Sequence, residues 1–174
     1  ASANIPTILL PGGPSLRGDW KGQELGSCTD CRRFWTELRA GNITQDDYDS
    51  MEESIYRSPG HCMVAGTAST MSVISEAMGL TLKGAASIPA VDSRRLTLSN
   101  KTGQRIVEMV NENIKIENFL KKENFHNGIS ALMSFGGSTN AIIHMLAIAG
   151  RTDVNIDLDD FNTISEKTPV IVNL

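Results

Sequence analysis

Apolar residues form two short runs near the ends of the chain and recur at helical spacing between them. Residues 5–10 are an apolar run that is entered through Pro6 and ends at Pro11-Gly12-Gly13. This pattern predicts a buried strand that leads into a glycine loop. Residues 170–172 (Val-Ile-Val) predict a second core strand, and residues 86–88 are a third candidate. Strand signals are therefore few.

The segments between these runs favour helices. The first helix is predicted over residues 27–39, with Phe34 on its apolar side. Thr44 is a good N-cap for the next helix, and Asp47, three positions later, gives that helix a capping-box start. We expect the second helix to run to about Tyr56. Further helices are predicted over residues 63–78, 105–113, 116–120 and 125–133, from the turn at 136–138 through 149, and from 158 onward.

These elements predict an α/β fold that is rich in helix and has a few-stranded, mostly parallel sheet. A strand at the very end of the chain needs neighbours in a sheet, and the pattern offers few of them. We therefore expect residues 1–174 to form a single segment of a larger domain, whose remaining strands lie outside this chain.

Composition places the chain among globular proteins. Of its 174 residues 40% are apolar and 21% are charged, which excludes wholesale disorder. The net charge of -4 gives no electrostatic attraction to nucleic acid or to an anionic membrane. The longest apolar stretch, residues 141–149, is too short to span a bilayer, and its His144 is expected to be a core histidine. Without a secretory signal pattern, we expect a reducing, cytoplasmic compartment.

The first candidate for chemistry is Cys62. The turn Ser58-Pro59-Gly60 is expected to set His61 and Cys62 at the start of a helix. The positive end of that helix would stabilise a thiolate, the form of cysteine that binds metals or attacks substrates. A buried cysteine that acts as a small apolar residue is an equally good interpretation. His61 is a candidate metal ligand or supporting donor, and a plain turn residue is the commoner case.

The second candidate is the Cys28-Thr29-Asp30-Cys31 segment. This spacing fits half of a zinc site or a redox-active dithiol, and Cys62 with His61 could complete a zinc site. The sequence contains no second pair with this spacing, so incidental cysteines are the favoured interpretation here.

The third candidate is a glycine turn that precedes an apolar helix. Free amides at such a turn, together with the helix dipole, favour an anion such as a carboxylate or phosphate. The alternative is structural, with Ser138 as an N-cap and the glycines permitting close packing. The same two interpretations apply to Pro11-Gly12-Gly13-Pro14 after the first predicted strand. The residues of the turn are Gly136, Gly137, Ser138, Thr139 and Asn140.

Several longer motifs also follow one another in a fixed order. They are Ile5-Pro6-Thr7-Ile8 with Pro11-Gly12-Gly13-Pro14, Pro59-Gly60-His61-Cys62 with Gly66-Thr67-Ala68-Ser69-Thr70-Met71, Ser87-Ile88-Pro89-Ala90, Thr102-Gly103-Gln104-Arg105-Ile106-Val107, and Gly136-Gly137-Ser138-Thr139-Asn140-Ala141. Taken together, these motifs resemble the dihydroxy-acid dehydratase / phosphogluconate dehydratase family. They are most similar to its sugar-acid branch, which includes arabinonate and xylonate dehydratases. The resemblance covers essentially the whole chain, and only the combination of motifs is specific.

The resemblance implies a cofactor and a role for Cys62. Members of the family hold an iron–sulfur cluster and a magnesium ion in an N-terminal α/β domain, and this chain resembles the later part of that domain. In the sugar-acid branch three cysteines hold a 2Fe–2S cluster, and Cys62 matches the third of them, with Gly60 and His61 shaping its surroundings. Cys28 and Cys31 match none of the three, and the resemblance leaves their role open. The magnesium ligands lie mostly outside this chain.

The resemblance also implies a reaction. It is the loss of water from a 2,3-dihydroxy (sugar) acid, which gives a 2-keto-3-deoxy acid. The serine proposed as the base belongs to a C-terminal domain, so we expect no catalytic residue here and no activity from this chain alone. The turn at 136–140 is expected to face the substrate or the interface between domains, and the whole protein is expected to form a homo-oligomer. The alternative is a small zinc-binding or assembly module without catalysis.

Overall fold

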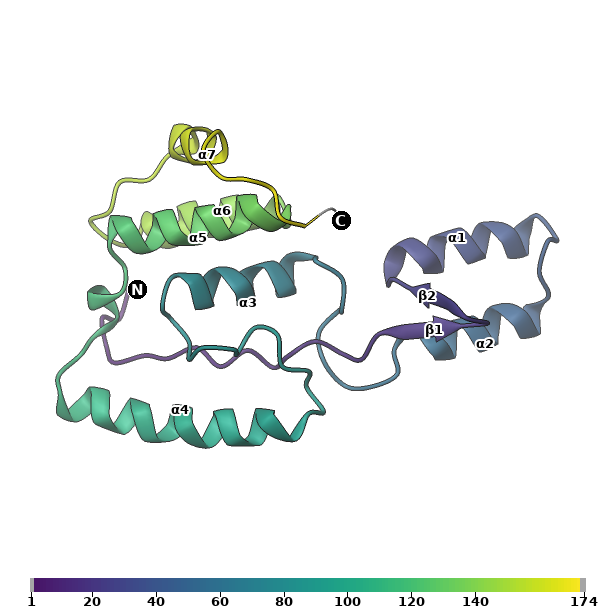
Figure 1. Ribbon diagram of the computed structural model, residues 1–174, viewed down its shortest axis with the longest axis horizontal. Helices are drawn as coiled ribbons and strands as arrows, with labels where there is room; N and C mark the ends of the chain where they lie inside the picture. The colour runs from purple at the N-terminus through teal and green to yellow at the C-terminus, as the bar shows by residue number, and fades with distance from the viewer. Residues whose placement is uncertain (1, 173–174) are drawn as a thin grey trace.

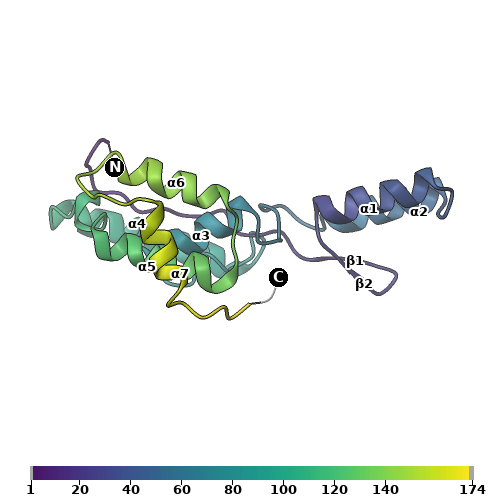
Figure 2. The ribbon, with the colours of Figure 1, turned by 90° about the horizontal axis from the view of Figure 1, so that it is seen from above.

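The computed structural model describes residues 2–172, and it consists of two parts (Figure 1). A small hairpin-and-helix unit, residues 18–55, lies to one side of a larger helical body (Figures 1 and 2). Two chain segments join the parts, one before the hairpin and one after its second helix. Each part has its own hydrophobic core.

The small unit begins with a β-hairpin. Strand β1 (Gly18–Trp20) pairs antiparallel with β2 (Gln23–Leu25), and a two-residue turn joins them. Both turn residues have positive φ, 50° at Lys21 and 78° at Gly22, which is the backbone conformation of a tight hairpin turn. Helices α1 (Cys28–Arg39) and α2 (Gln45–Ile55) follow. The core of the unit consists of Leu25, Phe34, Met51 and Ile55.

Local sequence determines the start of α2. The Thr44 hydroxyl accepts a hydrogen bond from the Asp47 amide at 3.1 Å, and the Asp47 carboxylate accepts one from the Thr44 amide at 3.2 Å. The predicted capping box is therefore confirmed. The predicted end near Tyr56 is also confirmed, because Tyr56 is the C-cap of α2.

The helical body is organised around three helices. Helix α3 (Thr67–Ala77) packs against α5 (Lys122–Phe135) and α6 (Asn140–Ala149). A Cβ atom at Gly128 of α5 would lie 2.9 Å from Met78 Cγ and 3.0 Å from Met145 Cε, so a glycine is what lets these helices approach closely. Helix α7 (Leu158–Ser165) packs on α5, and the remaining helices are α4 (Ser93–Asn111) and the 3-10 helix η1 (Ile116–Asn118).

The predicted strands are wrong within the described residues. Residues 5–10 and 170–172 form no strand, and residues 86–88 lie in a turn. Val170 and Ile171 are 71% and 73% exposed rather than part of a core. Among residues 2–172 the one sheet is the antiparallel hairpin, so a mostly parallel sheet is not supported there, whereas the richness in helix is confirmed. A strand needs a partner to supply its backbone hydrogen bonds, and no neighbouring strand is present in this part of the chain.

Several boundaries also differ from the expected ones. Helix α3 begins at Thr67 rather than at residue 63, and α4 begins at Ser93 rather than at 105, because the Asp92 carboxylate caps it by accepting from the Arg94 amide at 2.8 Å. His144 is exposed and is not a core residue, although Met145 beside it is fully buried. In the described part of the chain, no helix combines the length and the apolar character needed to cross a bilayer.

Candidate functional site

Cys62 lies in one of the two segments that join the small unit to the helical body. This segment runs beside the other one through a parallel bridge between Pro14 and His61. The His61 amide donates to the Gly13 carbonyl at 3.0 Å, and the Ser15 amide donates to the His61 carbonyl at 2.9 Å. Gly60 has a φ of +136°, and a Cβ atom there would lie 2.6 Å from the Pro14 carbonyl carbon. Only glycine fits this position, so Gly60 allows the two segments to meet immediately before Cys62.

The thiol of Cys62 is half-buried and faces the small unit. Its Sγ donates a hydrogen bond to the Ser27 hydroxyl at 2.8 Å. On the other side, the Ser69 hydroxyl from the first turn of α3 lies 2.9 Å from the Val64 carbonyl oxygen and 3.2 Å from the Cys62 carbonyl oxygen, so the two carbonyl groups share its one proton. The expected position at the start of a helix is wrong, because α3 begins only at Thr67 and a helix dipole acts mainly within its first turn. The thiol is held by tertiary contacts instead, and it is not sealed inside a core.

His61 supports the backbone of Cys62. Its Nδ1 lies 2.9 Å from the Cys62 carbonyl oxygen, and a carbonyl oxygen only accepts, so Nδ1 carries the proton and donates. In the neutral ring Nε2 is then an acceptor. This Nε2 atom is buried and has no hydrogen-bond partner among the described residues. The ring therefore has one buried nitrogen without a partner in the described part of the chain, directly beside Cys62.

The sequence pattern does not predict two hydroxyl groups near Cys62, those of Ser27 and Tyr56. Ser27 is the first and is 3% exposed; the sequence indicates it only as the first residue of the helix predicted over residues 27–39. The Tyr56 hydroxyl is the second, and both Ser27 and Cys62 influence its pKa. Partial burial raises the pKa of Tyr56, the hydrogen bond with Ser27 opposes that rise, and the Cys62 thiol adds to it. Ser27, Tyr56 and Cys62 therefore form one polar group at the junction of the two parts.

The glycine turn at residues 136–140 lies against the start of α3. Gly136 ends α5 in the left-handed conformation, with a φ of 65°. A Cβ atom at Gly137 would lie 2.8 Å from Thr70 Cγ2, so its lack of a side chain permits this contact. The Ser138 amide then donates to the Thr70 hydroxyl at 3.0 Å. The close packing that the sequence offered as a role for these glycines is thus present at Gly137, whereas a Cβ atom at Gly136 would meet nothing within 4 Å.

Thr67, at the start of α3, connects this turn to the Cys62 segment. Asn140 Nδ2 donates to the Thr67 hydroxyl at 2.9 Å, and the Ser138 hydroxyl lies 3.2 Å from it. Thr139, not Ser138, is the N-cap of α6. The starts of α3 and α6 are therefore tied together, and a cavity of about 220 Å³ lies beside the turn. Its lining consists of Leu132, Met133, Gly136, Gly137, Ser138, Thr139 and Ile142.

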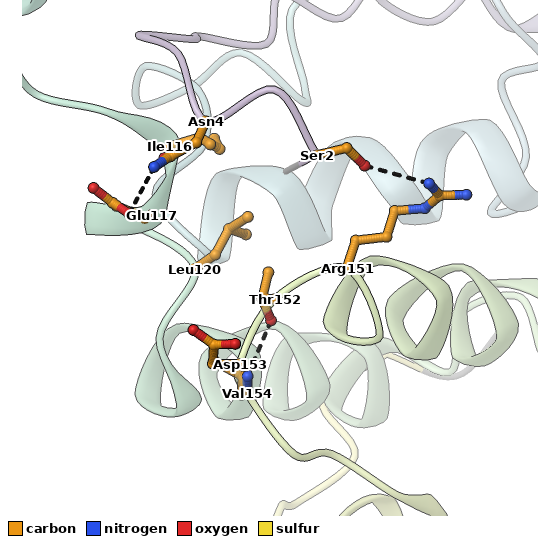
Figure 3. A pocket seen from close by; sticks show the side chains of 9 residues that line it. All are labelled: Ser2, Asn4, Ile116, Glu117, Leu120, Arg151, Thr152, Asp153 and Val154. Carbon is orange, nitrogen blue, oxygen red and sulfur yellow. Dashed lines mark hydrogen bonds between the residues drawn. The ribbon is translucent and has the colours of Figure 1, made fainter.

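A larger cavity, of about 450 Å³, lies elsewhere, next to the described N-terminal residues and η1 (Figure 3). Asn4 donates to Glu117 at 2.7 Å on one side of it, and Arg151 donates to the Ser2 hydroxyl at 3.3 Å on another (Figure 3). None of the residues that line it is a cysteine or a histidine. Its lining therefore offers neither a thiol nor an imidazole.

Comparison with known protein families identifies the family to which the chain belongs. The sequence profile of the dihydroxy-acid/6-phosphogluconate dehydratase N-terminal family matches residues 1–174. The chain belongs to this family. The family resemblance inferred from the motifs is therefore confirmed.

Individual dehydratases match the chain over almost its whole length. A protein of Rhizobium meliloti (strain 1021) that carries a dehydratase name is 50% identical over 99% of the chain. An L-arabinonate dehydratase of Rhizobium leguminosarum bv. trifolii (strain WSM2304) is 44% identical over 100% of the chain, and a dihydroxy-acid dehydratase of Sulfurisphaera tokodaii is 41% identical over 100%. The chain covers 30%, 30% and 31% of these three relatives, so it spans about a third of their length.

The described residues of this dehydratase-family chain do not assemble a metal site by themselves. They contain no group of three or more His, Cys, Asp or Glu side chains that could hold a metal ion. The zinc site that would combine Cys28, Cys31, His61 and Cys62 is therefore not assembled. Cys28 is exposed and Cys31 is half-buried in the first turns of α1. Burial raises the pKa of the Cys31 thiol, and the Glu52 carboxylate raises it further.

Proposed function

We propose that this chain supplies Cys62 to the 2Fe–2S cluster of a hydro-lyase. The supporting observation is the half-buried Cys62 thiol, held on a segment fixed by Gly60 and His61 where two parts of the molecule meet. A single thiolate cannot hold a cluster, so the other ligands come from the rest of a longer protein. This agrees with the relatives, which are about three times as long as the chain.

The proposed substrate class is a 2,3-dihydroxy acid, most simply a sugar acid. Relatives named for L-arabinonate, D-xylonate and dihydroxy acids match the chain at 44%, 41% and 41% identity. Because these compounds share a carboxylate with hydroxyl groups at C2 and C3, we propose that unit as the part that reacts. It would lose its C2 proton and its C3 hydroxyl as water, and the resulting enol would become a 2-keto-3-deoxy acid.

The residues of this chain would have supporting roles in that reaction. When bound, the cluster supplies a Lewis-acidic iron for the departing hydroxyl, and a magnesium ion with ligands mostly outside this chain stabilises charge beside the carboxylate. Cys62 would hold the iron as a thiolate, and His61 would fix its backbone through Nδ1. The turn at 136–140 would contribute to the substrate cavity or to the interface with another domain, because it is tied to the start of α3.

We also propose that this chain is a single segment of an N-terminal domain with a mostly parallel sheet. Residues 5–10 would become a strand of that sheet by pairing with strands from the remainder of the protein. Leu9 and Leu10 are each 42% exposed, and the Leu9 amide donates to the Leu80 carbonyl at 2.8 Å, which supports an extended segment with apolar surface still to be covered. Residues 170–172 have the same apolar, exposed character. The complete protein is proposed to be a cytoplasmic homo-oligomer.

The test is an assay of the intact protein that contains this segment. After anaerobic reconstitution with iron and sulfide, it should convert aldonic acids to 2-keto-3-deoxy acids, measured as 2-keto acid formed. Cys62→Ser should lower the rate by more than about 100-fold, because even residues that only support metal ligands often cost 10–100-fold. Cys28→Ser is the matched control and should keep the activity. Full activity in Cys62→Ser would refute the proposal.

A further inference from the structure

Ser27 occupies a helix-cap position without acting as a cap. It precedes α1 as the N-cap residue, yet its side chain makes no hydrogen bond to the amides of that helix. Serine at this position usually bonds such an amide, and this contact is the reason for its frequency there. The Ser27 hydroxyl instead accepts from Cys62 Sγ, across 35 positions of sequence.

A neighbouring residue organises the start of α1 in place of Ser27. The Asp30 carboxylate, in the first turn, accepts from the Gly26 amide and from the Arg33 guanidinium, the latter at 2.7 Å. A carboxylate near the N-terminus of a helix also interacts favourably with the helix dipole. The hydroxyl of Ser27 is therefore left for the thiol. In this it differs from Thr44, Asp92 and Asp157, which are N-caps whose side chains bond their own helices.

The chemistry of the bond between Ser27 and Cys62 changes when sulfur becomes a ligand. With a protonated thiol, sulfur donates and the hydroxyl accepts, as in the structure. A thiolate has no proton to donate, so the only hydrogen bond left between the same two atoms runs from the Ser27 hydroxyl to sulfur. Ser27 is 3% exposed, which keeps water from replacing it.

We infer that Ser27 is a positioning residue that donates a hydrogen bond to the Cys62 sulfur when this sulfur holds iron. The inference rests on the proposed function. A hydrogen bond to a ligand sulfur withdraws electron density from the iron and favours the reduced state, so it raises the reduction potential. Ser27 also belongs to the small unit, so the bond makes that unit part of the surroundings of the cluster.

The test is an anaerobic reduction titration of the reconstituted intact protein, followed by electron paramagnetic resonance. Ser27→Ala should shift the reduction potential to a more negative value and move the sulfur-to-iron absorption bands. Ser27→Thr keeps a hydroxyl and should restore both readouts. Ser27→Gly lacks the hydroxyl but is well tolerated at N-caps, so its potential decides the matter if Ser27→Ala does not fold. Ser99→Ala, which removes a hydroxyl bonded to the Arg95 carbonyl on α4, is the matched control.

The outcomes separate the two proposals. If Cys62→Ser loses the cluster while Ser27→Ala or Ser27→Gly keeps the parental potential and spectrum, the role of Ser27 is refuted and the proposed function stands. If Cys62→Ser keeps the same cluster, the proposed function fails and the inference fails with it. A negative shift in both Ser27→Ala and Ser27→Gly, with recovery in Ser27→Thr, supports the inference.

Discussion

The small unit and the helical body are stabilised in different ways. The core of the small unit comes from residues 25 to 55, so its contacts are short in sequence. The core of the body joins Ile74 to Phe161 and still leaves Leu9 and Val170 exposed. The small unit thus builds its hydrophobic core from a short stretch of chain. The body, in contrast, exposes apolar segments that are available for packing against further parts of the protein. Cys62 lies between the two, held by Ser27 of the one and Ser69 of the other.

The largest expected effect is a loss of stability in one of the two cores but not in the other. Phe125 is fully buried in the body, so Phe125→Ala should lower the free energy of unfolding of the body by about 3–5 kcal/mol. Hydrogen exchange should accelerate in α3, α5 and α6 but not in α1 and α2, because these helices belong to the other core. Val107→Ala, at a position that is 60% exposed, is the control. Equal acceleration in both parts would show that they unfold as one unit.

The next effect concerns the connection between the parts. Gly60→Ala forces an L side chain into a φ of +136° and against the backbone of Pro14 and Ser15. We expect a loss of about 3 kcal/mol in stability and faster alkylation of Cys62, because the parallel bridge that fixes its segment is broken. Gly12→Ala is the matched control, since a Cβ atom there meets nothing within 4 Å. Chemical denaturation measures the first effect and mass spectrometry the second, and equal results for the two variants would contradict the account.

Smaller effects on stability are expected when a helix N-cap is removed, and each part offers one such cap. Thr44→Ala should cost about 1 kcal/mol in the small unit, and Asp157→Ala should cost about as much in the body. Asp157 accepts from the amides of Asp159 and Asp160 at 3.0 and 3.1 Å, so its loss leaves two donors without their bond. Urea denaturation with residue-level detection by NMR should show each loss in its own part. A loss distributed over both parts would contradict their independence.

The smallest effect is a dependence of the small unit on pH. The hydrogen bond from Lys21, followed by those from Thr44, lowers the pKa of Asp47 to about 2. A depressed pKa means that this stabilisation is complete above the ordinary Asp pKa near 4 and is lost as pH falls towards about 2. Lys21→Met should raise the pKa of Asp47, observed by carbon NMR of its carboxylate. Lys83→Met, in the body, should leave it unchanged, and an unshifted Asp47 in Lys21→Met would refute the assignment.

The sequence was informative where structure depends on neighbouring residues. The capping box at Thr44 and the end of α2 follow from residues within one helix, so they could be predicted. The hairpin was missed because each of its strands has only three residues, although the Lys21-Gly22 turn was a usable signal. Residues 5–10 look like a strand in sequence, but a strand also requires a partner, which the pattern of one segment does not contain.

The candidate site likewise has features that local sequence predicts and features that depend on contacts between distant residues. The Gly60-His61-Cys62 motif identified the thiol, and the need for glycine at position 60 is visible in the structure. Ser27 could not be connected to Cys62 from sequence, since the two are 35 positions apart and serine before a helix suggests an ordinary cap. The contact between the turn at 136–140 and Thr67 likewise depends on the packing of α3 against α6.

The central claim is that Cys62 is the iron ligand of this chain. Its most direct test is the iron content and Mössbauer spectrum of the intact protein, reconstituted anaerobically, in Cys62→Ser and in the double variant Cys28→Ser, Cys31→Ser. The account predicts that the cluster spectrum disappears in Cys62→Ser and is unchanged in the double variant. A cluster that survives in Cys62→Ser, or that is lost in the double variant, would contradict it.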